Sequence, residues 1–175
     1  MEFRQGPIHG VVVKDLSRHT DRRGWLTELF RSDEIDPECM PAMGYISATE
    51  PGVTRGPHEH QDQADLFCFI GPSTFRISLW DNRKDSSTYG HAMIVEAGEA
   101  QPRSVLIPVG VVHAYTNIGP IAGWVINLPN RLYAGPGHKL PVDEIRHEDD
   151  PNSAFKVAVD HTISDRGATG KHGKN

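Results

Sequence analysis

The sequence has few cysteines and no long apolar run. Its 175 residues include only two cysteines, Cys39 and Cys68, which do not have the spacing of a redox or zinc motif, so we expect no disulfide. No apolar stretch approaches the roughly 18 residues that a membrane-spanning helix needs, and the first ten residues lack the apolar segment of a signal peptide. The sequence therefore predicts a cytoplasmic protein without a membrane partner.

Basic residues are also scarce. Eighteen Lys and Arg residues stand against 23 Asp and Glu residues, which gives a formal net charge of −5 with neutral histidines. Proteins that bind nucleic acids present a basic surface to the phosphate backbone, so we expect no nucleic-acid partner. An anionic small molecule would have to be bound by local arginines, because the overall charge repels it.

Helical periodicity is weak and limited to short stretches at 32–38 and 142–148. Alternating or continuous apolar segments, separated by Gly, Pro and Asn turns, predict strands instead. These segments are 10–13, 24–30, 66–70, 74–80, 104–107, 111–117 and 124–128. Short strands at this spacing indicate an antiparallel sandwich or barrel. We expect one all-β domain over 1–165, followed by a polar tail over 166–175.

Three of the ten histidines occur in strand-like segments. His58 and His60 share one face of a strand, and His113 lies in the middle of another. If both strands line one barrel, these histidines and Asp65 can converge, and three imidazoles with one carboxylate suit a divalent Fe, Mn, Ni or Zn ion. The alternative is that each histidine is simply packed or exposed. The acidic residues after His147 predict a solvated stretch rather than a site.

Two segments, GPHEHQDQAD at 56–65 and PVGVVHAYTN at 108–117, resemble the two signature motifs of the cupin superfamily. The second matches at Pro108, Gly110, His113 and Asn117. The first has Asp65 where the superfamily usually has Glu, and it has five residues rather than six before the following glycine. The resemblance implies a double-stranded β-helix, or jelly-roll barrel, with a site inside the barrel.

Further segments resemble, in order, those of dTDP-4-dehydrorhamnose 3,5-epimerases. They are DRRGWLTELF at 21–30, GVTRGPH at 52–58, IPVGVVHAY at 107–115 and YAGP at 133–136. The resemblance covers about 20–165. It implies an isomerase that acts without a cofactor on a nucleotide-linked 4-keto-6-deoxy sugar in deoxysugar and cell-surface polysaccharide biosynthesis. It also implies a homodimer that exchanges N-terminal strands.

The same resemblance assigns catalytic roles to three residues. His58 matches the general base that removes a proton from the carbon next to the ketone, and Tyr133 matches the tyrosine that returns a proton to the opposite face. Asp165 is the candidate for the carboxylate that pairs with the histidine. This chemistry is reasonable, because a ketone acidifies the adjacent C–H and a histidine titrates near neutral pH.

Substrate binding is assigned to five further residues: Arg23, Glu28, Arg55, His113 and Tyr115. In the family, the position of Arg55 binds the nucleotide diphosphate. The positions of Arg23 and Glu28 hold the ligand of the neighbouring subunit. Arginine suits the first role because its planar fork matches phosphate oxygens.

The sequence also departs from the family. The lysine expected to stabilise the enolate oxygen aligns with Ala64, and His60 stands where the family usually has glutamine. Two alternatives therefore stay open: a metal-dependent cupin enzyme, such as a dioxygenase or sugar isomerase, and a non-enzymatic sugar-binding cupin. A metal bound to His58 would prevent the same nitrogen from acting as the base.

Overall fold

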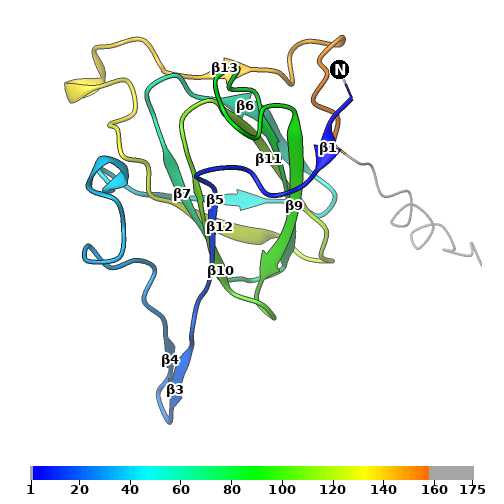
Figure 1. The fold of residues 1–175 in the computed structure, drawn as a ribbon. Coiled ribbons are helices and arrows are strands. Elements are labelled where there is room, and N and C mark those ends of the chain that lie inside the picture. The colour runs from blue at the N-terminus through cyan, green and yellow to red at the C-terminus, as the bar shows by residue number, and fades with distance from the viewer. Residues whose placement is uncertain (1, 158–175) are drawn as a thin grey trace, which may run out of the picture.

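The computed structural model describes residues 2–157 and consists almost entirely of β-strands. The expected tail, 166–175, and Asp165 lie outside the described residues. Two sheets face each other, and a two-stranded hairpin extends from them (Figure 1). The strands are β1 (Arg4–Gln5), β2 (Val12–Asp15), β3 (His19–Asp21), β4 (Gly24–Leu26), β5 (Tyr45–Thr49), β6 (Thr54–Glu59), β7 (Asp65–Phe69), β8 (Thr74–Asp81), β9 (His91–Gly98), β10 (Arg103–Ile107), β11 (Val111–Asn117), β12 (Gly123–Asn127) and β13 (Ile145–Arg146).

The strand order confirms the all-β jelly-roll barrel. One sheet has the order β1-β9-β8-β11-β6-β13 and the other β2-β10-β7-β12-β5, while β3 and β4 form a separate two-stranded sheet. Neighbouring strands are antiparallel except for the short parallel pair β1 and β9. Strands that are adjacent in space are mostly distant in sequence, which is typical of Greek-key connections.

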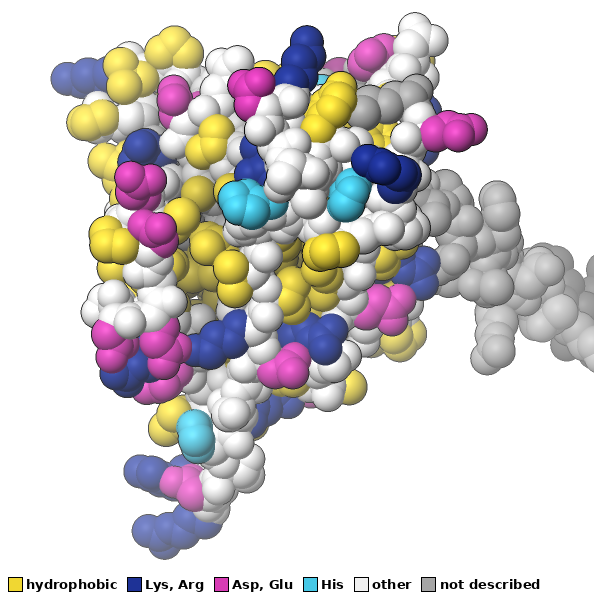
Figure 2. Space-filling view, viewed as in Figure 1, with side chains coloured by type: hydrophobic (Ala, Val, Ile, Leu, Met, Phe, Trp, Pro, Cys, Tyr) yellow, Lys and Arg dark blue, Asp and Glu magenta, His cyan; other side chains and the backbone are white. Residues whose placement is uncertain are grey.

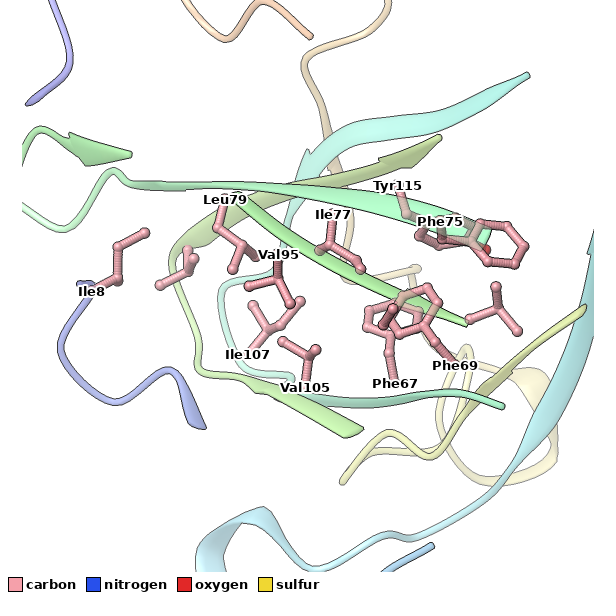
Figure 3. Close-up of a cluster of buried hydrophobic side chains, with 13 residues drawn as sticks. Ile8, Phe67, Phe69, Phe75, Ile77, Leu79, Val95, Val105, Ile107 and Tyr115 are labelled. Atoms are coloured by element: carbon pink, nitrogen blue, oxygen red, sulfur yellow. The ribbon is translucent and has the colours of Figure 1, made fainter. Parts of the chain in front are cut away.

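The main core fills the space between the two sheets (Figure 3). On β8, Phe75, Ile77 and Leu79 point into this core and are at most 1% exposed. The opposite face of β8 is covered as well, because the ring of Trp80 packs against Phe155 at a centroid distance of 5.9 Å. The C-terminal part of the described chain therefore closes the outside of the six-stranded sheet.

Most of the predicted strands are present, but the sequence missed β5 and β9 and the short strands β1, β3 and β13. The predicted strand 24–30 ends at Leu26, because this part of the chain has no partner strand in the barrel. Thr27 instead donates a hydrogen bond from Oγ1 to the carbonyl of Ser17 at 2.8 Å. The β3–β4 hairpin extends away from the barrel (Figure 1), and Lys and Arg side chains gather at its tip (Figure 2).

The predicted helix at 142–148 is wrong. This segment contains β13, which pairs with the edge of β6, so the unpaired hydrogen-bonding groups of an edge strand outweigh a weak helical pattern. The predicted helix at 32–38 is reduced to the 3₁₀ turn η1 (Pro37–Cys39), and a second turn, η2, covers Pro136–His138. No helix in residues 2–157 is long and apolar enough to cross a membrane.

Candidate functional site

His58 and His113 face each other across the paired strands β6 and β11. Their ring centroids are 4.4 Å apart in an edge-on arrangement. Next to this pair β6 has a bulge: between the register pairs His58–His113 and Arg55–Tyr115, the two residues Gly56 and Pro57 oppose the single residue Ala114 of β11. Gly56 lies in this bulge with φ of +83°, and a Cβ there would meet the His113 carbonyl oxygen at 2.6 Å. A glycine is therefore required for the two histidine-bearing strands to approach this closely.

His60 and Asp65 complete the cluster from the turn between β6 and β7. Asp65 Oδ2 lies 3.1 Å from His60 Nε2 and 3.5 Å from His113 Nε2. One nitrogen from each of His58, His60 and His113 lies within 4.8 Å of the others. The structure therefore brings together all four residues of the predicted ligand set.

Asp65 is 1% exposed and is held by two amide side chains. Asn127 Nδ2 and Gln63 Nε2 donate to Asp65 Oδ1 at 2.9 and 3.0 Å. Burial raises the pKa of a carboxyl group, but the hydrogen bond from His60 and the neighbouring imidazoles outweigh burial and lower the pKa of Asp65. Asp65 is therefore a carboxylate at neutral pH. Sequence analysis missed Asn127, which belongs to no motif.

Both ring nitrogens of His60 lie beside an acceptor, and the amide nitrogen of Gln63 also lies 3.3 Å from Nε2. Nδ1 donates to the backbone carbonyl of Asp143, and Nε2 faces the carboxylate of Asp65. Burial opposes the charged form, but the hydrogen bond and charge of Asp65 raise the pKa of His60. Because a carbonyl and a carboxylate each need a donor, this arrangement favours the doubly protonated imidazolium.

The other two histidines are held in the neutral form. Burial, together with His113 and His60, lowers the pKa of His58 from 6.5 to about 2. Burial also lowers the pKa of His113, although Asp65 opposes this shift. The shifts therefore favour the charged forms of Asp65 and His60 and the neutral forms of His58 and His113.

A pocket of about 920 Å³ opens above this cluster. Its lining includes Arg55, His58, His60, Tyr115 and Tyr133. A pocket of this size suits a ligand larger than a simple sugar. Four of the residues predicted for catalysis or substrate binding, Arg55, His58, Tyr115 and Tyr133, thus share one cavity.

His113 differs from the expectation that it binds substrate. It is 2% exposed and does not line the pocket, because pairing with β6 and β8 places it in the floor of the barrel beside Phe67. Tyr115, two residues further along β11, does reach the cavity. Its hydroxyl lies 2.9 Å from Ser47 Oγ.

Arg23 and Glu28 do not reach this pocket. Arg23 lies at the β3–β4 turn and pairs with Asp21 at 2.6 Å, and Glu28 lies 3.7 Å from Arg31. Both residues belong to the exposed N-terminal part that extends from the barrel. Their predicted role concerned the ligand of a neighbouring subunit, so it is not a property of this chain's own cavity.

Arg55 is oriented by uncharged groups. Its Nε donates to Thr49 Oγ1 at 2.9 Å and its Nη2 to the Ala48 carbonyl at 2.7 Å. Arg131, which sequence analysis did not single out, also lines the pocket. Within residues 2–157, neither arginine forms an ion pair with a carboxylate, and both are therefore available to an anionic ligand.

The acidic stretch after β13 is not simply solvated as predicted. His147 Nε2 lies 2.9 Å from Glu59 Oε1, and Glu59, which is 7% exposed, also accepts from Asn82 Nδ2 at 2.9 Å. The His147 ring packs against Phe155 at a centroid distance of 4.6 Å. In the sequence His58-Glu59-His60, the two histidines point toward the pocket and Glu59 anchors the C-terminal segment on the other face.

Comparisons with known proteins agree with this architecture. A family model described as dTDP-4-dehydrorhamnose 3,5-epimerase matches residues 5–171. A probable low-salt glycan biosynthesis epimerase, Agl13 of Haloferax volcanii, is 40% identical over 128 residues, covering 72% of this chain and 81% of that protein. The spore coat polysaccharide biosynthesis protein SpsL of Bacillus subtilis is 39% identical over 112 residues, covering 64% and 73%.

Solved structures share the fold. The RmlC epimerase of Mycobacterium tuberculosis superposes with a TM-score of 0.67 and 20% identity, covering 83% of this chain and 72% of that one. NovW of Streptomyces spheroides, a 4-keto-6-deoxy sugar epimerase, superposes with a TM-score of 0.70 and 22% identity, covering 89% and 78%. At these identities the likeness establishes the fold alone.

The two neutral buried histidines predict that the protein loses stability in mild acid. Because their pKa values are lower in the folded than in the unfolded state, the unfolded chain binds more protons as the pH falls below about 6.5. For His58 this costs about 2 kcal/mol of unfolding free energy between pH 7 and pH 5, and His113 acts in the same direction. His60 has the opposite effect: because its pKa is raised in the folded state, its protonation increases the unfolding free energy as the pH falls over the upper part of this range.

Urea unfolding at pH 7 and pH 5 measures this effect, and His58→Gln should reduce the loss of stability by about 2 kcal/mol. His9→Gln, at an exposed histidine, is the control and should leave the loss unchanged. Equal pH dependence in the wild type and His58→Gln would contradict the assignment of His58 as a neutral buried group.

Proposed function

The chain belongs to the dTDP-4-dehydrorhamnose 3,5-epimerase family, and we propose that it inverts a carbon of a nucleotide-linked 4-keto-6-deoxy sugar by proton transfer through His58 and Tyr133. The chain is a sugar-nucleotide epimerase, an isomerase of deoxysugar biosynthesis. Enzymes of this family act without a cofactor. One observation supports the proposed residue roles: neutral His58, Tyr133 and two arginines line one pocket. The arginines are Arg55 and Arg131, which form no ion pair with a carboxylate within residues 2–157.

His58 is the proposed base. The ketone acidifies the neighbouring C–H bond, and the neutral imidazole takes that proton while the electron pair moves to the ketone oxygen as an enolate. Tyr133 then gives its hydroxyl proton to the opposite face of the same carbon, which inverts the configuration. Exchange with solvent restores neutral His58 and the tyrosine hydroxyl.

The low basicity of His58 requires that the enolate be stabilised. Position 64 carries no charge, because Ala64 is a buried alanine 4% exposed. The ring centroid of His60 lies 5.5 Å from that of His58, and His60 lines the same pocket. We infer that the His60 imidazolium supplies the positive potential that a lysine supplies elsewhere in the family.

Arg55 and Arg131 are the proposed diphosphate ligands. Both line the cavity and neither is neutralised by a carboxylate within the described chain. Bidentate contact between a guanidinium and phosphate oxygens would hold the nucleotide while the sugar lies over His58. The local arginines thus overcome the unfavourable net charge of −5.

A metal-dependent reaction is the second candidate, and orphaned polar atoms favour it. Among residues 2–157, His58 Nδ1 and His113 Nε2 are buried without a hydrogen-bond partner, and Asp65 Oδ2 faces only the His60 and His113 rings. The donor set of three imidazoles and a carboxylate fits Fe, Mn, Ni or Zn. The ion would act as a Lewis acid on the ketone oxygen. It would also require the loss of a proton from His60, whose two nitrogens already serve Asp143 and Asp65.

A homodimer is the proposed assembly. On the outer face of the five-stranded sheet, Val12, Ile46 and Trp124 are 53%, 63% and 54% exposed, and the hairpin exposes Trp25 and Leu26. An apolar face of this kind is typical of an interface between proteins. A second copy would cover it and would bring Arg23 and Glu28 toward a partner. The cytoplasmic location stays a prediction from the sequence.

The epimerase reaction predicts that the protein incorporates solvent deuterium into a dTDP-linked 4-keto-6-deoxy sugar. His58→Ala should abolish incorporation, because the base is lost, and His9→Ala should not change it. Tyr133→Phe should still incorporate deuterium but form little inverted product, since the opposite-face acid is missing. Proton NMR of the sugar follows both events, and absence of exchange in the wild type with any 4-keto nucleotide sugar would refute the function.

Elemental analysis of protein purified without a histidine tag separates the two candidates. The epimerase reaction predicts full activity without a stoichiometric transition metal, before and after dialysis against a chelator. The second candidate predicts one ion per chain, a lower melting temperature after its removal and loss of the ion in Asp65→Asn. A chelated protein that retains full deuterium exchange rules out the second candidate.

The proposed dimer predicts a molar mass in solution of twice that of the chain. Trp124→Lys combined with Ile46→Lys places charges on the apolar sheet face and should yield monomers, because burial of unpaired charge is costly. Light scattering after size-exclusion chromatography measures the mass. Val109→Lys, at another partly exposed apolar side chain, is the control. A monomeric wild type would contradict the assembly.

A further inference from the structure

One face of β5 carries a row of hydroxyl groups. Tyr45, Ser47 and Thr49 alternate along the strand, so their side chains point to the same side of the sheet. The Ser47 hydroxyl lies 2.9 Å from the Tyr115 hydroxyl, and Thr49 Oγ1 accepts a hydrogen bond from Arg55 Nε at 2.9 Å. Tyr45 and Ser47 line the pocket. The proposed proton transfer has not yet given Tyr45 a role.

Asn127 fixes the position of the Tyr45 hydroxyl. The two residues are register partners in the antiparallel pair β5 and β12, and Asn127 Nδ2 donates to Tyr45 Oη at 2.9 Å. The same amide nitrogen donates its other hydrogen to Asp65 Oδ1, also at 2.9 Å. The opposite orientation of the amide is excluded, because its oxygen would then face the buried carboxylate, which only accepts. Tyr45 is therefore the acceptor in its contact with Asn127.

The proton of the Tyr45 hydroxyl is consequently available to a ligand. Within residues 2–157, Tyr45 Oη takes part in no hydrogen bond other than the one from Asn127. Desolvation of the hydroxyl raises the pKa of Tyr45 and the charge of Asp65 adds to this rise, although the hydrogen bond from Asn127 opposes it. A protonated phenol whose oxygen is held by a buried amide presents a fixed hydrogen-bond donor to the cavity.

The other groups around the site are occupied. The two nitrogens of His60 lie beside the carbonyl of Asp143 and the carboxylate of Asp65, so His60 supplies positive potential but has no N–H directed at a ligand. The hydroxyl of Tyr115 is paired with Ser47. Tyr45 is joined to the same carboxylate from its other oxygen, through Asn127. An enolate oxygen formed in this pocket would therefore find its hydrogen-bond donor at Tyr45.

We propose that Tyr45 is a further catalytic residue, whose hydroxyl donates a hydrogen bond to the ketone oxygen of the sugar and holds that oxygen more strongly once it becomes an enolate. The inference rests on the proposed function, in which His58 removes the proton. The O–H bond of Tyr45 stays intact, and the proton taken from carbon stays on His58. A donor fixed before the reaction begins needs no reorganisation as the charge develops on the oxygen, which is the usual source of this kind of stabilisation.

Tyr45→Phe tests this role, because it keeps the ring and removes only the donor. It should lower kcat for deuterium incorporation by about 100-fold with KM changed less than about threefold, since the hydrogen bond is stronger to the enolate than to the ketone. Tyr89→Phe removes the same hydroxyl from a tyrosine that does not line the pocket, and it should leave both constants close to those of the wild type. Tyr133→Phe should differ from Tyr45→Phe, because it impairs inversion rather than incorporation.

Calorimetric titration with dTDP, which carries no ketone, shows whether the pocket of Tyr45→Phe is intact. The affinity for dTDP should equal that of the wild type, and a loss of dTDP binding would overturn the inference, because the hydroxyl would then have a structural role. An unchanged kcat in Tyr45→Phe would also overturn it, as would a raised KM with kcat preserved. If the wild type exchanges no deuterium, the proposed function fails and the inference fails with it. A fully active Tyr45→Phe beside an active wild type refutes the role of Tyr45 alone.

Discussion

The buried carboxylate of Asp65 is the constraint on which the site depends. A charge that is 1% exposed in the floor of a barrel must be compensated locally, since an unpaired ion would cost several kcal/mol. Asn127 and Gln63 satisfy one oxygen, and His60 faces the other. The proton on His60 therefore follows from the burial of Asp65. The carbonyl of Asp143 then occupies the second nitrogen of His60 and ties the returning segment to the same pair.

The charge on His60 affects the neighbouring residues in two ways. It adds to burial and to His113 in lowering the pKa of His58, and it provides a positive potential where an enolate would form. The first effect makes His58 a weaker base, and the second lowers the energy of the product of proton removal. A catalytic site benefits when the second effect is larger, because the positive group is fixed before the reaction begins and needs no reorganisation. A neutral side chain at position 60 would remove the positive potential, while burial would still hold His58 in the neutral form.

Sequence patterns predicted the barrel and the meeting of His58, His60, Asp65 and His113, because strand periodicity determines which side chains share a face. They failed where a tertiary contact decides the local structure. The stretch 142–148 has a weak helical pattern, yet the open edge of β6 draws it into β13. Asn127 and Asp143 resemble ordinary polar residues in the sequence, and their importance comes from partners more than 60 residues away, such as the Asn127 contact with Asp65. Arg131 likewise belongs to no motif, and only the structure places it in the pocket.

The histidine nitrogens of this cluster can bind either a proton or a metal ion, and protonation and metal binding compete at His60. Metal ligation requires a neutral imidazole, so binding would release the His60 proton and also break its contact with the Asp143 carbonyl. His58 and His113 need not release a proton to bind a metal, because burial already keeps them neutral. The competition is therefore confined to one residue. A weaker hydrogen bond between His60 and Asp143 would favour metal binding at His60. A stronger contact between His60 and Asp65 would favour protonation of His60. The Asp143 carboxylate accepts three backbone amide hydrogen bonds, which fix the segment between η2 and β13 and so hold the Asp143 carbonyl against His60. This anchoring stabilises the protonated state, in which His58 is left free to act as the base.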